Sequence, residues 1–380
     1  MNVLLLHNSY REPGGEERSV AAIAALLRGH GHGVDVLERS SAALSGPGGR
    51  LRAGVAMVAG GVDPSGVAAA VRRHRAAVVH AHNVHPLFGV RALRAARREG
   101  ARVVLHVHNY RLVCAIAIQF RDGHVCTRCR RRNTWPGVRL RCRGNLAEAL
   151  PYGAGLALQQ RRLLDAADAV LVPSDFARER LSSVGVPVER ATTLPNFVPA
   201  RDLAPAPPDA PPGHALFAGR LVYEKGVDIA ITAAARARVP LAIAGSGPEE
   251  ARLRSLAARL DAPVTFLGRL DAEALAQARG GAAFSVLPSR WDEPGPYAAL
   301  ESMATGVPVL AADVGSLPEM VGAESVVRSD DPGSWAEAMA ALWSDAALRR
   351  RRAEAALAQA RDRFGEDRFY SGLMDVYGGR

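Results

Sequence analysis

The sequence contains no long apolar run and has few aromatic residues. Aromatic residues make up 5% of the 380 residues, although 48% are hydrophobic. No stretch approaches the roughly 18 to 20 consecutive apolar residues that cross a bilayer. The N-terminal segment MNVLLLHNSY lacks the basic flank and the small-residue cleavage site of a secretion signal. We therefore expect a cytoplasmic globular protein of about two domains.

Acidic residues are fewer than basic ones, since 38 Asp and Glu face 48 Lys and Arg and leave a net charge of +10. Such an excess is typical of proteins that bind nucleic acid, an anionic membrane face or anionic substrates. Alternatively, the excess of basic residues reflects only the Arg- and Ala-rich composition that a GC-rich genome encodes. The charge alone leaves the partner open.

Short apolar runs alternate with helical patterns along both halves of the chain, which is typical of βαβ units and a parallel sheet. The expected strands are Val3–Leu6, Val34–Leu37, Ala77–His80, Val103–Val107 and Ala169–Val172, then Ala215–Ala218, Leu241–Ala244, Val264–Leu267, Ala283–Leu287 and Val307–Ala311. A Pro- and Ala-rich stretch between the two series reads as a linker. The predicted fold is α/β, with two doubly wound, Rossmann-like sheets that face a central cleft.

Two glutamates, Glu293 and Glu301, stand in the block WDEPGPYAALESMATGVPVL. The block follows one expected strand and precedes the next, so it reads as strand, loop, helix, strand, with Glu301 opening the helix. Ligands bind at the carboxyl ends of strands in open α/β sheets. The alternative is that both glutamates are solvated acids favoured by the helix dipole.

Two cations, Arg220 and Lys225, flank the start of an expected helix at Val227–Arg238. A helix amino terminus already favours anions. An arginine fork and a lysine point charge would turn it into a clamp for a diphosphate. The alternative is that both are ordinary surface charges.

Gly14 and Gly15 follow the first strand and precede an expected helix at Glu16–Leu27. Glycine there lets the backbone approach a phosphate or a sugar closely, and a plain turn is the alternative. The segment is not GxGxxG, and no acid follows at the distance that a nicotinamide ribose requires, so a dinucleotide fingerprint is excluded.

Histidines gather at two expected strand ends, as His80, His82 and His85 and then as His106 and His108. Alternation along the second strand predicts that His106 and His108 share a face, with His108 pointing into the cleft. Hydrogen bonding is preferred over metal binding, because no carboxylate or thiol partner for a metal can be placed beside them.

With these motifs the chain resembles the family 4 retaining glycosyltransferases, which depend on nucleotide sugars and have the GT-B architecture. The resemblance covers nearly the whole chain. It rests on Gly14-Gly15, on His108 in HVHNY, on Asn196 in LPNFV, on GRLxxEKG at Gly219–Gly226, on Gly245-Ser-Gly-Pro, on Phe266–Gly268 and on the Glu-x7-Glu block.

The resemblance implies two domains, an acceptor-binding domain at residues 1–198 and a nucleotide-sugar-binding domain at residues 214–365. Residues 199–213 would be the linker, and a last helix at residues 366–380 would pack back on the first domain. The enzyme would move a sugar from a UDP- or GDP-type donor to a saccharide, lipid-linked or small-molecule acceptor, for polysaccharide or natural-product biosynthesis. A nucleotide-sugar epimerase or a phosphorylase is the alternative enzyme, although no pyridoxal-binding lysine motif is evident.

The resemblance also assigns roles. Arg220 and Lys225 would hold the donor diphosphate, and Glu301 would bind the ribose. Glu293 would lie beside the donor sugar, and His108 would contact the donor sugar or a phosphate. The implied catalytic set is Glu293, His108, Arg220 and Lys225, and the implied donor-binding set is Gly14, Gly15, Arg220, Lys225, Gly245, Leu267, Gly295, Pro296, Tyr297 and Glu301. No cofactor is expected for catalysis. Gly295 and Pro296 replace the phenylalanine and glycine of the commoner E-x-F-G loop, which leaves the sugar open.

All four cysteines, Cys114, Cys126, Cys129 and Cys142, fall within one short segment with CxxC at its centre. In a cytosolic protein this favours a tetrahedral structural zinc site over disulfides. The alternative is four free thiols.

The cysteine segment also carries many arginines: Arg121, Arg128, Arg130, Arg131, Arg132, Arg139, Arg141 and Arg143. A basic zinc-bearing protein that binds nucleic acid is therefore the non-enzyme alternative. No recognition helix follows and Pro136-Gly137 interrupts the segment, so nucleic acid is not the expected partner. A surface loop that contacts an acidic acceptor or an anionic membrane at the inner face accounts for the same charges.

Overall fold

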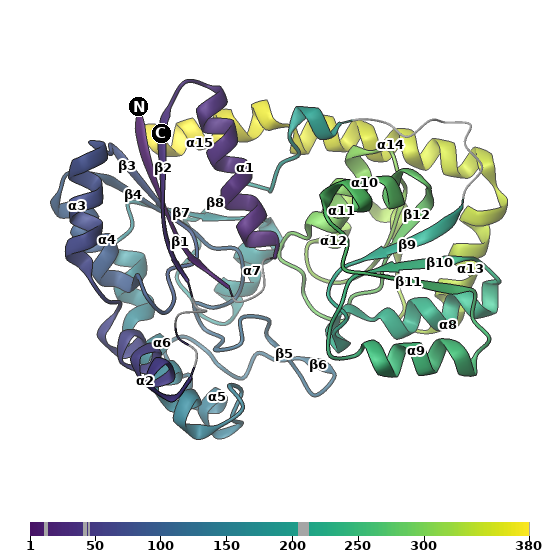
Figure 1. The fold of residues 1–380 in the computed structure, drawn as a ribbon, viewed down its shortest axis with the longest axis horizontal. Helices are drawn as coiled ribbons and strands as arrows, with labels where there is room; N and C mark the ends of the chain where they lie inside the picture. Colours follow the sequence, from purple (N-terminus) through teal and green to yellow (C-terminus); the bar gives the residue numbers. More distant parts are fainter. Residues whose placement is uncertain (11–13, 41–43, 45, 204–212, 380) are drawn as a thin grey trace. The chain divides into compact units, whose positions relative to one another are not determined.

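The computed structural model describes residues 1–10, 14–40, 44, 46–203 and 213–379 (Figure 1). The chain forms two compact units. The first consists of Met1–Gln119, Cys126–Pro195 and Phe369–Arg380, and the second of Phe120–Val125 and Asn196–Arg368. Most of the predicted linker, at residues 204–212, lies outside the described residues.

The first unit is built on a six-stranded parallel sheet of order β2-β1-β3-β4-β7-β8. Its central strands are buried on both faces, which is why they read as continuous apolar runs, and Leu4, Leu5 and Leu6 are inaccessible to solvent. Its strands are β1 (Asn2–Ser9), β2 (Gly33–Ser40), β3 (Val78–Ala81), β4 (Arg102–His106), β7 (Ala169–Val172) and β8 (Thr192–Thr193). The helices are α1 (Gly15–Gly29), α2 (Gly46–Ala59), α3 (Pro64–His74), α4 (Gly89–Arg98), α5 (Trp135–Arg139), α6 (Leu146–Asp165) and α7 (Asp175–Ser183).

The C-terminal helix α15 (Glu366–Gly378) packs on the sheet of the first unit. The Tyr377 hydroxyl lies 2.8 Å from Nδ1 of His80, and Arg102 Nε donates to the Val376 carbonyl at 2.9 Å. The ring of Tyr370 stacks on His30 with centroids 3.7 Å apart. The last helix is therefore fixed by side chains from several elements of the first unit.

The second unit has its own six-stranded parallel sheet, of order β11-β10-β9-β12-β13-β14. Its strands are β9 (His214–Ala218), β10 (Leu241–Ala244), β11 (Val264–Gly268), β12 (Ala282–Leu287), β13 (Val309–Ala312) and β14 (Val326–Val327). The α-helices are α8 (Val227–Ala237), α9 (Glu250–Arg259), α10 (Ala272–Gly280), α11 (Tyr297–Ala304), α12 (Leu317–Val321), α13 (Pro332–Ser344) and α14 (Ala346–Phe364), and the 3₁₀ turns are η2 (Ala200–Asp202), η3 (Tyr223–Lys225) and η4 (Ala323–Ser325). Phe284 and Trp335 are inaccessible members of a buried hydrophobic core in this unit.

A short antiparallel hairpin, β5 (Phe120–Arg121) with β6 (His124–Val125), is grouped with the second unit. The ring of Phe120 lies 6.3 Å from that of Tyr223. The sequence did not predict this hairpin, because its strands are only two residues long and carry no alternation.

The predicted α/β fold with two doubly wound sheets is confirmed, and each of the ten predicted runs forms a strand. The two-residue strands β8 and β14 were missed for the same reason as the hairpin. One boundary was wrong, since α11 begins at Tyr297 and Glu301 is its fifth residue rather than its first.

No single helix in the described part of the chain has the length and apolar character of a membrane span. The helices Gly48–Ala59 and Pro64–His74, bent by 73° at the break between them, satisfy that test together, by length and composition only.

Candidate active site

The loop between β9 and α8 is held by close backbone packing at two glycines. Gly226 has φ of +67°, and a Cβ atom built on it would lie 1.8 Å from the Pro288 carbonyl oxygen. Gly245 has φ of +148°, and its Cβ would lie 1.8 Å from the Gly219 carbonyl oxygen. Only glycine fits both the backbone conformation and the space. The GRLxxEKG loop is therefore fixed between the carboxyl ends of β10 and β12.

This packing places Lys225 directly before Gly226, the N-cap residue of α8. Lys225 Nζ lies 2.5 Å from Oε1 of Glu293 and 5.6 Å from the centre of the Trp291 ring. Arg220 is exposed, and within the described chain no hydrogen bond or ion pair engages its side chain. Lys225, which was predicted to bind the diphosphate, is thus paired with Glu293, which was predicted to lie beside the sugar. Arg220, the other predicted diphosphate ligand, is exposed to solvent.

Glu293 is buried, with 3% of the residue exposed, and its charge is compensated locally. In addition to Lys225, the Ser289 hydroxyl donates to Oε1 at 2.6 Å. Its backbone carbonyl accepts from the Ser316 N–H at 2.8 Å. A buried carboxylate needs such partners, so Lys225 and Ser289 fix the position of the Glu293 side chain. The sequence did not point to Ser289.

The loop after Glu293 is tied back by Asn196. The Asn196 amide donates through Nδ2 to the Gly295 carbonyl at 2.9 Å. Pro296 follows as the buried N-cap residue of α11, and Tyr297 is the first residue of that helix. A proline at this position lacks a backbone donor, so it offers no N–H group to a ligand.

Glu301 pairs with Arg279, because Arg279 Nη2 lies 2.6 Å from Glu301 Oε2. The Arg279 side chain is 8% exposed and that of Glu301 is 16% exposed. Arg279 comes from α10, in a segment that carries no motif, and its pairing could not be read from the sequence.

The remaining donor-set residues are more dispersed. Leu267 lies in β11 and packs, partly buried, against a cluster that contains Leu216. Gly14 is exposed at the N-cap of α1, and its N–H donates to Glu17 Oε2 at 2.8 Å. The φ of −140° at Gly14 is a backbone conformation that any residue can adopt. Gly15 is the first residue of α1.

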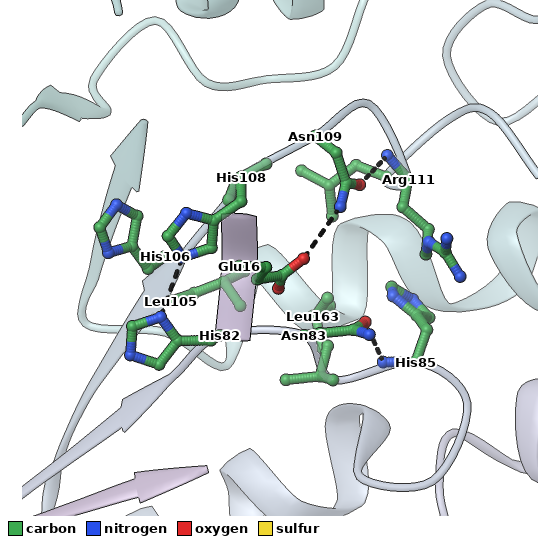
Figure 2. A pocket seen from close by; sticks show the side chains of 13 residues that line it. Glu16, His82, Asn83, His85, Leu105, His106, His108, Asn109, Arg111 and Leu163 are labelled. Carbon is green, nitrogen blue, oxygen red and sulfur yellow. Dashed lines mark hydrogen bonds between the residues drawn. The ribbon is translucent and has the colours of Figure 1, made fainter. Parts of the chain in front are cut away.

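Four histidines, His80, His82, His106 and His108, form a ladder of neighbouring rings at the ends of β3 and β4 in the first unit. Figure 2 shows His82, His106 and His108 of this ladder, with His85 apart from them beside Arg111. The rings of His106 and His108 stack with centroids 4.1 Å apart, which confirms that they share a face. His82 Nδ1 lies 2.9 Å from His108 Nε2, and His80 Nε2 lies 3.3 Å from His106 Nδ1. The expected hydrogen bonding within the cluster is therefore present.

Burial lowers the pKa of these imidazoles, because the interior disfavours the charged form. It brings the pKa of His80, His85 and His108 to about 3 and holds those of His82 and His106 well below the usual value. The neighbouring histidines, and Arg111 beside His85, add to the effect. The ladder is neutral at pH 7.

A pocket opens beside the ladder, and it is lined by Glu16, Asn109 and Arg111 as well as by His82, His85, His106 and His108 (Figure 2). The Asn109 amide donates to Glu16 Oε2 at 3.3 Å, and the Arg111 backbone N–H donates to Asn109 Oδ1 at 2.9 Å. Burial raises the pKa of Glu16, and the neighbouring His7, Tyr10 and Arg111 oppose the rise. The pocket thus offers neutral imidazoles, one carboxyl and one guanidinium to a polar ligand.

Nitrogen atoms of His80, His82 and His106 lie within 4.8 Å of one another, as metal ligands would. Both nitrogens of His80 are already engaged, one with Tyr377 and the other with His106. Among the residues that the structure describes, no carboxylate joins the three, so a divalent cation there would bring an uncompensated charge into the interior. The ladder suits hydrogen bonding to a ligand better than metal binding.

The four cysteines lie in the first unit as half-buried free thiols. None of them lines the pocket beside the histidines.

Comparison with known proteins gives the family of the chain. The model of the glycosyl transferase 4-like domain matches residues 14–196, and that of the glycosyl transferases group 1 matches residues 205–359. A D-inositol 3-phosphate glycosyltransferase of Acidothermus cellulolyticus is 30% identical over 96% of this chain and 86% of its own length. A glycogen synthase of Mycobacterium tuberculosis is 36% identical over 39% of this chain, and the chain spans only 38% of that relative's length.

Among solved structures, Anabaena HepE, determined in complex with UDP and glucose, superposes with a TM-score of 0.68 over 100% of both chains at 20% identity. The two parallel-sheet units therefore form a GT-B fold. The chain belongs to the group 1 glycosyltransferase family, and it is a glycosyltransferase.

Proposed function

We propose that this glycosyltransferase takes its sugar from a nucleotide diphosphate donor and transfers it with retention of the anomeric configuration. The observation that carries the proposal is the contact between Lys225 and the buried Glu293 beside the start of α8. The pair joins a phosphate-binding cation to a carboxylate at the sugar position. HepE, which has the same fold, was solved with UDP and glucose.

The diphosphate would lie at the start of α8, between Arg220 and Lys225. A lysine ammonium has three donors, so Lys225 can keep Glu293 and still donate to a phosphate oxygen. Arg220 is exposed and is available as a fork for the same group. The departing diphosphate gains negative charge as the glycosidic bond breaks, and donors fixed in advance stabilise that charge. Loss of one such group costs on the order of a hundredfold or more in rate.

The two glutamates would divide the donor between them. Glu293 is held close to Lys225 and would lie against the sugar, where its negative charge stabilises an oxocarbenium-like centre. Glu301 would accept from the ribose hydroxyls, since a carboxylate has about four acceptor sites and the bond from Arg279 occupies only part of them.

The acceptor would bind in the first-unit pocket beside His108. Neutral imidazoles and Asn109 suit the hydroxyl groups of a sugar or a polyol, and the Arg111 guanidinium suits an anionic substituent. The relative named for inositol 3-phosphate has an acceptor of that kind in its name. We therefore favour a hydroxyl-rich acceptor that carries a negative group.

Thermal unfolding with a panel of nucleotide sugars tests the donor. A donor at a hundred times its dissociation constant should stabilise the fold by about 2.7 kcal/mol. The stabilising donor is then incubated with candidate acceptors, and the anomer of the product is assigned by NMR. Retention is expected. Inversion would contradict the mechanism, and no stabilisation by any nucleotide sugar would contradict the donor class.

Conversion of the donor to its epimer without an acceptor would favour the epimerase alternative. The variant Glu293→Gln separates binding from chemistry, because it should still be stabilised by the donor but should not turn it over.

A further inference from the structure

Most of the large apolar side chains that are exposed on the described chain belong to three helices of the first unit, α2, α5 and α6. Trp135, the first residue of α5, is 62% exposed. The others are Leu51, Val55 and Val58 on α2 and Leu146, Leu150 and Leu158 on α6. Single exposed apolar residues are ordinary, but a group of them on adjoining helices marks an interaction surface.

The three helices lie side by side in the first unit (Figure 1). Close backbone contact joins α2 to α6, since a Cβ atom built on Gly54 would lie 3.1 Å from the Pro151 side chain, and one built on Gly155 would lie 2.7 Å from the Met57 carbonyl oxygen. The order of these contacts shows that the two helices run parallel. On the opposite side of α6, Gly153 packs against α5. Helix α6 therefore lies between α2 and α5.

The exposed apolar residues of α2 and α6 face the same side of this pair. Those of α2 lie roughly a quarter-turn from the side that meets α6, away from the buried Ala56. Those of α6 lie roughly a quarter-turn in the opposite sense from the side that meets α2, away from the buried Leu156. Because the helices are parallel, these opposite rotations turn both stripes outward together. We refer to the six exposed residues of α2 and α6 as the α2–α6 face.

The surroundings of the α2–α6 face are basic. Residues 46–59 and 126–147 contain no Asp or Glu. Glu148, in the first turn of α6, lies 3.6 Å from both Arg50 and Arg143 and is compensated by them. In the part of the chain that the structure describes, no ion pair engages Arg52 or Arg139. The exposed arginines of the two ranges include Arg50, Arg52, Arg130, Arg132, Arg139 and Arg141.

We propose that the α2–α6 face docks on an anionic lipid bilayer, with its apolar side chains among the lipid headgroups and the neighbouring arginines at the lipid phosphates. Helices with an exposed apolar stripe and a basic border bind membranes in this way without crossing them. An exposed tryptophan such as Trp135 also favours the level of the headgroups. The proposal does not depend on the donor or on the stereochemistry of transfer.

A second copy of this chain would fit the α2–α6 face less well. A twofold dimer brings the same surface of both subunits together. It would therefore set the arginines of one copy against those of the other, with no acidic residue in residues 46–59 or 126–147 to separate them. An anionic bilayer supplies both the apolar layer and the opposite charge.

Flotation of the full-length protein with lipid vesicles is the first test. Binding is expected to vesicles of equal parts phosphatidylglycerol and phosphatidylcholine, and it should weaken as salt is added because salt screens the charges. Vesicles of phosphatidylcholine alone should bind far less protein. The fluorescence of Trp135 should shift to shorter wavelength on binding, and Trp135→Phe should lose that shift. Absence of binding to the anionic vesicles, or equal binding to both kinds, would overturn the proposal without any variant of the face.

The triple variant Leu51→Gln, Val55→Gln, Leu150→Gln tests the apolar side chains. It should bind the anionic vesicles about tenfold or more weakly, because affinity rises with the apolar area that enters the bilayer. All three residues are exposed, so the fold should be retained, and thermal unfolding checks this. Leu260→Gln is the matched control, because Leu260 is an exposed leucine at the end of α9, and it should bind as the wild type does. Unchanged vesicle binding by the triple variant would overturn the proposal, as would a wild-type dimer that the triple variant converts to monomer in sedimentation.

The double variant Arg52→Gln, Arg139→Gln tests the charges. Vesicle affinity should fall by about fivefold for each arginine that is neutralised. Arg259→Gln, which removes an exposed arginine from the last residue of α9, is the control and should leave the affinity unchanged. Equal affinity of the double variant and the wild type would overturn the assignment of these arginines to the lipid phosphates.

Discussion

Arg279 and Glu301 form an ion pair in the interior of the second unit, with Nη2 2.6 Å from Oε2 and both side chains largely shielded from water. The carboxylate predicted to bind ribose is therefore positioned by a residue from a different helix.

Arg279→Met should destabilise the protein by about 3 kcal/mol, because it leaves the Glu301 carboxylate shielded from water without its cation. Nucleotide affinity should fall with it, since Glu301 loses its fixed orientation. Urea unfolding and calorimetric titration measure the two effects. Arg279→Lys is the control and should retain part of both. An Arg279→Met protein with unchanged stability and unchanged nucleotide affinity would show that the pair positions nothing.

Glu293→Gln should lower turnover by on the order of a hundredfold or more while nucleotide diphosphate affinity is kept or rises. The reason is the 2.5 Å contact with Lys225, whose charge becomes available to phosphate when Glu293 is neutral. Glu301→Gln should do the reverse and weaken nucleotide binding first. The two variants are compared by steady-state kinetics and by titration with the nucleotide alone. Equal losses of affinity would refute this division of roles.

Asn196→Asp should slow transfer by roughly fivefold, in keeping with the loss of a hydrogen bond worth about 1 kcal/mol. The carboxylate has the size of the amide but cannot donate to the Gly295 carbonyl, which now accepts at 2.9 Å. The effect should appear in the turnover number, with the fold retained by circular dichroism. An unchanged turnover number would mean that the loop is held by its other contacts.

Stability should fall steeply below pH 6.5. Burial lowers the pKa of the ladder imidazoles and of His85, which lines the same pocket, and brings it to about 3 for His80, His85 and His108, whereas the unfolded chain titrates near 6.5. The unfolded state therefore binds more protons, and the stability that is complete above pH 6.5 is lost as the pH falls toward 3. Within that window, each such histidine lowers the free energy of unfolding by about 1.4 kcal/mol for every pH unit that the pH falls.

Urea unfolding at a series of pH values measures this slope. The variant His85→Gln should reduce this slope by the contribution of about one proton. Substitution of the exposed His124 by Gln should leave the slope unchanged. A flat stability between pH 7 and pH 4 would show that the ladder is charged or solvated in the folded state.

The sequence predicted the elements better than their contacts. Runs such as those in β1 and β12 were recognisable because parallel strands buried on both faces are continuously apolar. Glu293 and Lys225 were each predicted as site residues from local motifs, but their pairing joins residues far apart in the chain. Arg279 and Ser289 carry no local signal at all, since an arginine in a helix and a serine after a strand have many ordinary uses.

We propose that Arg220 and Lys225 bind the donor diphosphate at the start of α8, and calorimetric titration with a nucleoside diphosphate measures that binding. Arg259, exposed at the last residue of α9, provides the matched control because helices of a parallel sheet end at the edge opposite the ligand. We predict equal affinity for the wild type and Arg259→Ala, and a loss of about tenfold or more for Arg220→Ala, as expected for a charge-assisted bond worth about 1.5 kcal/mol or more. Equal affinity in all three proteins would show that Arg220 does not bind the diphosphate.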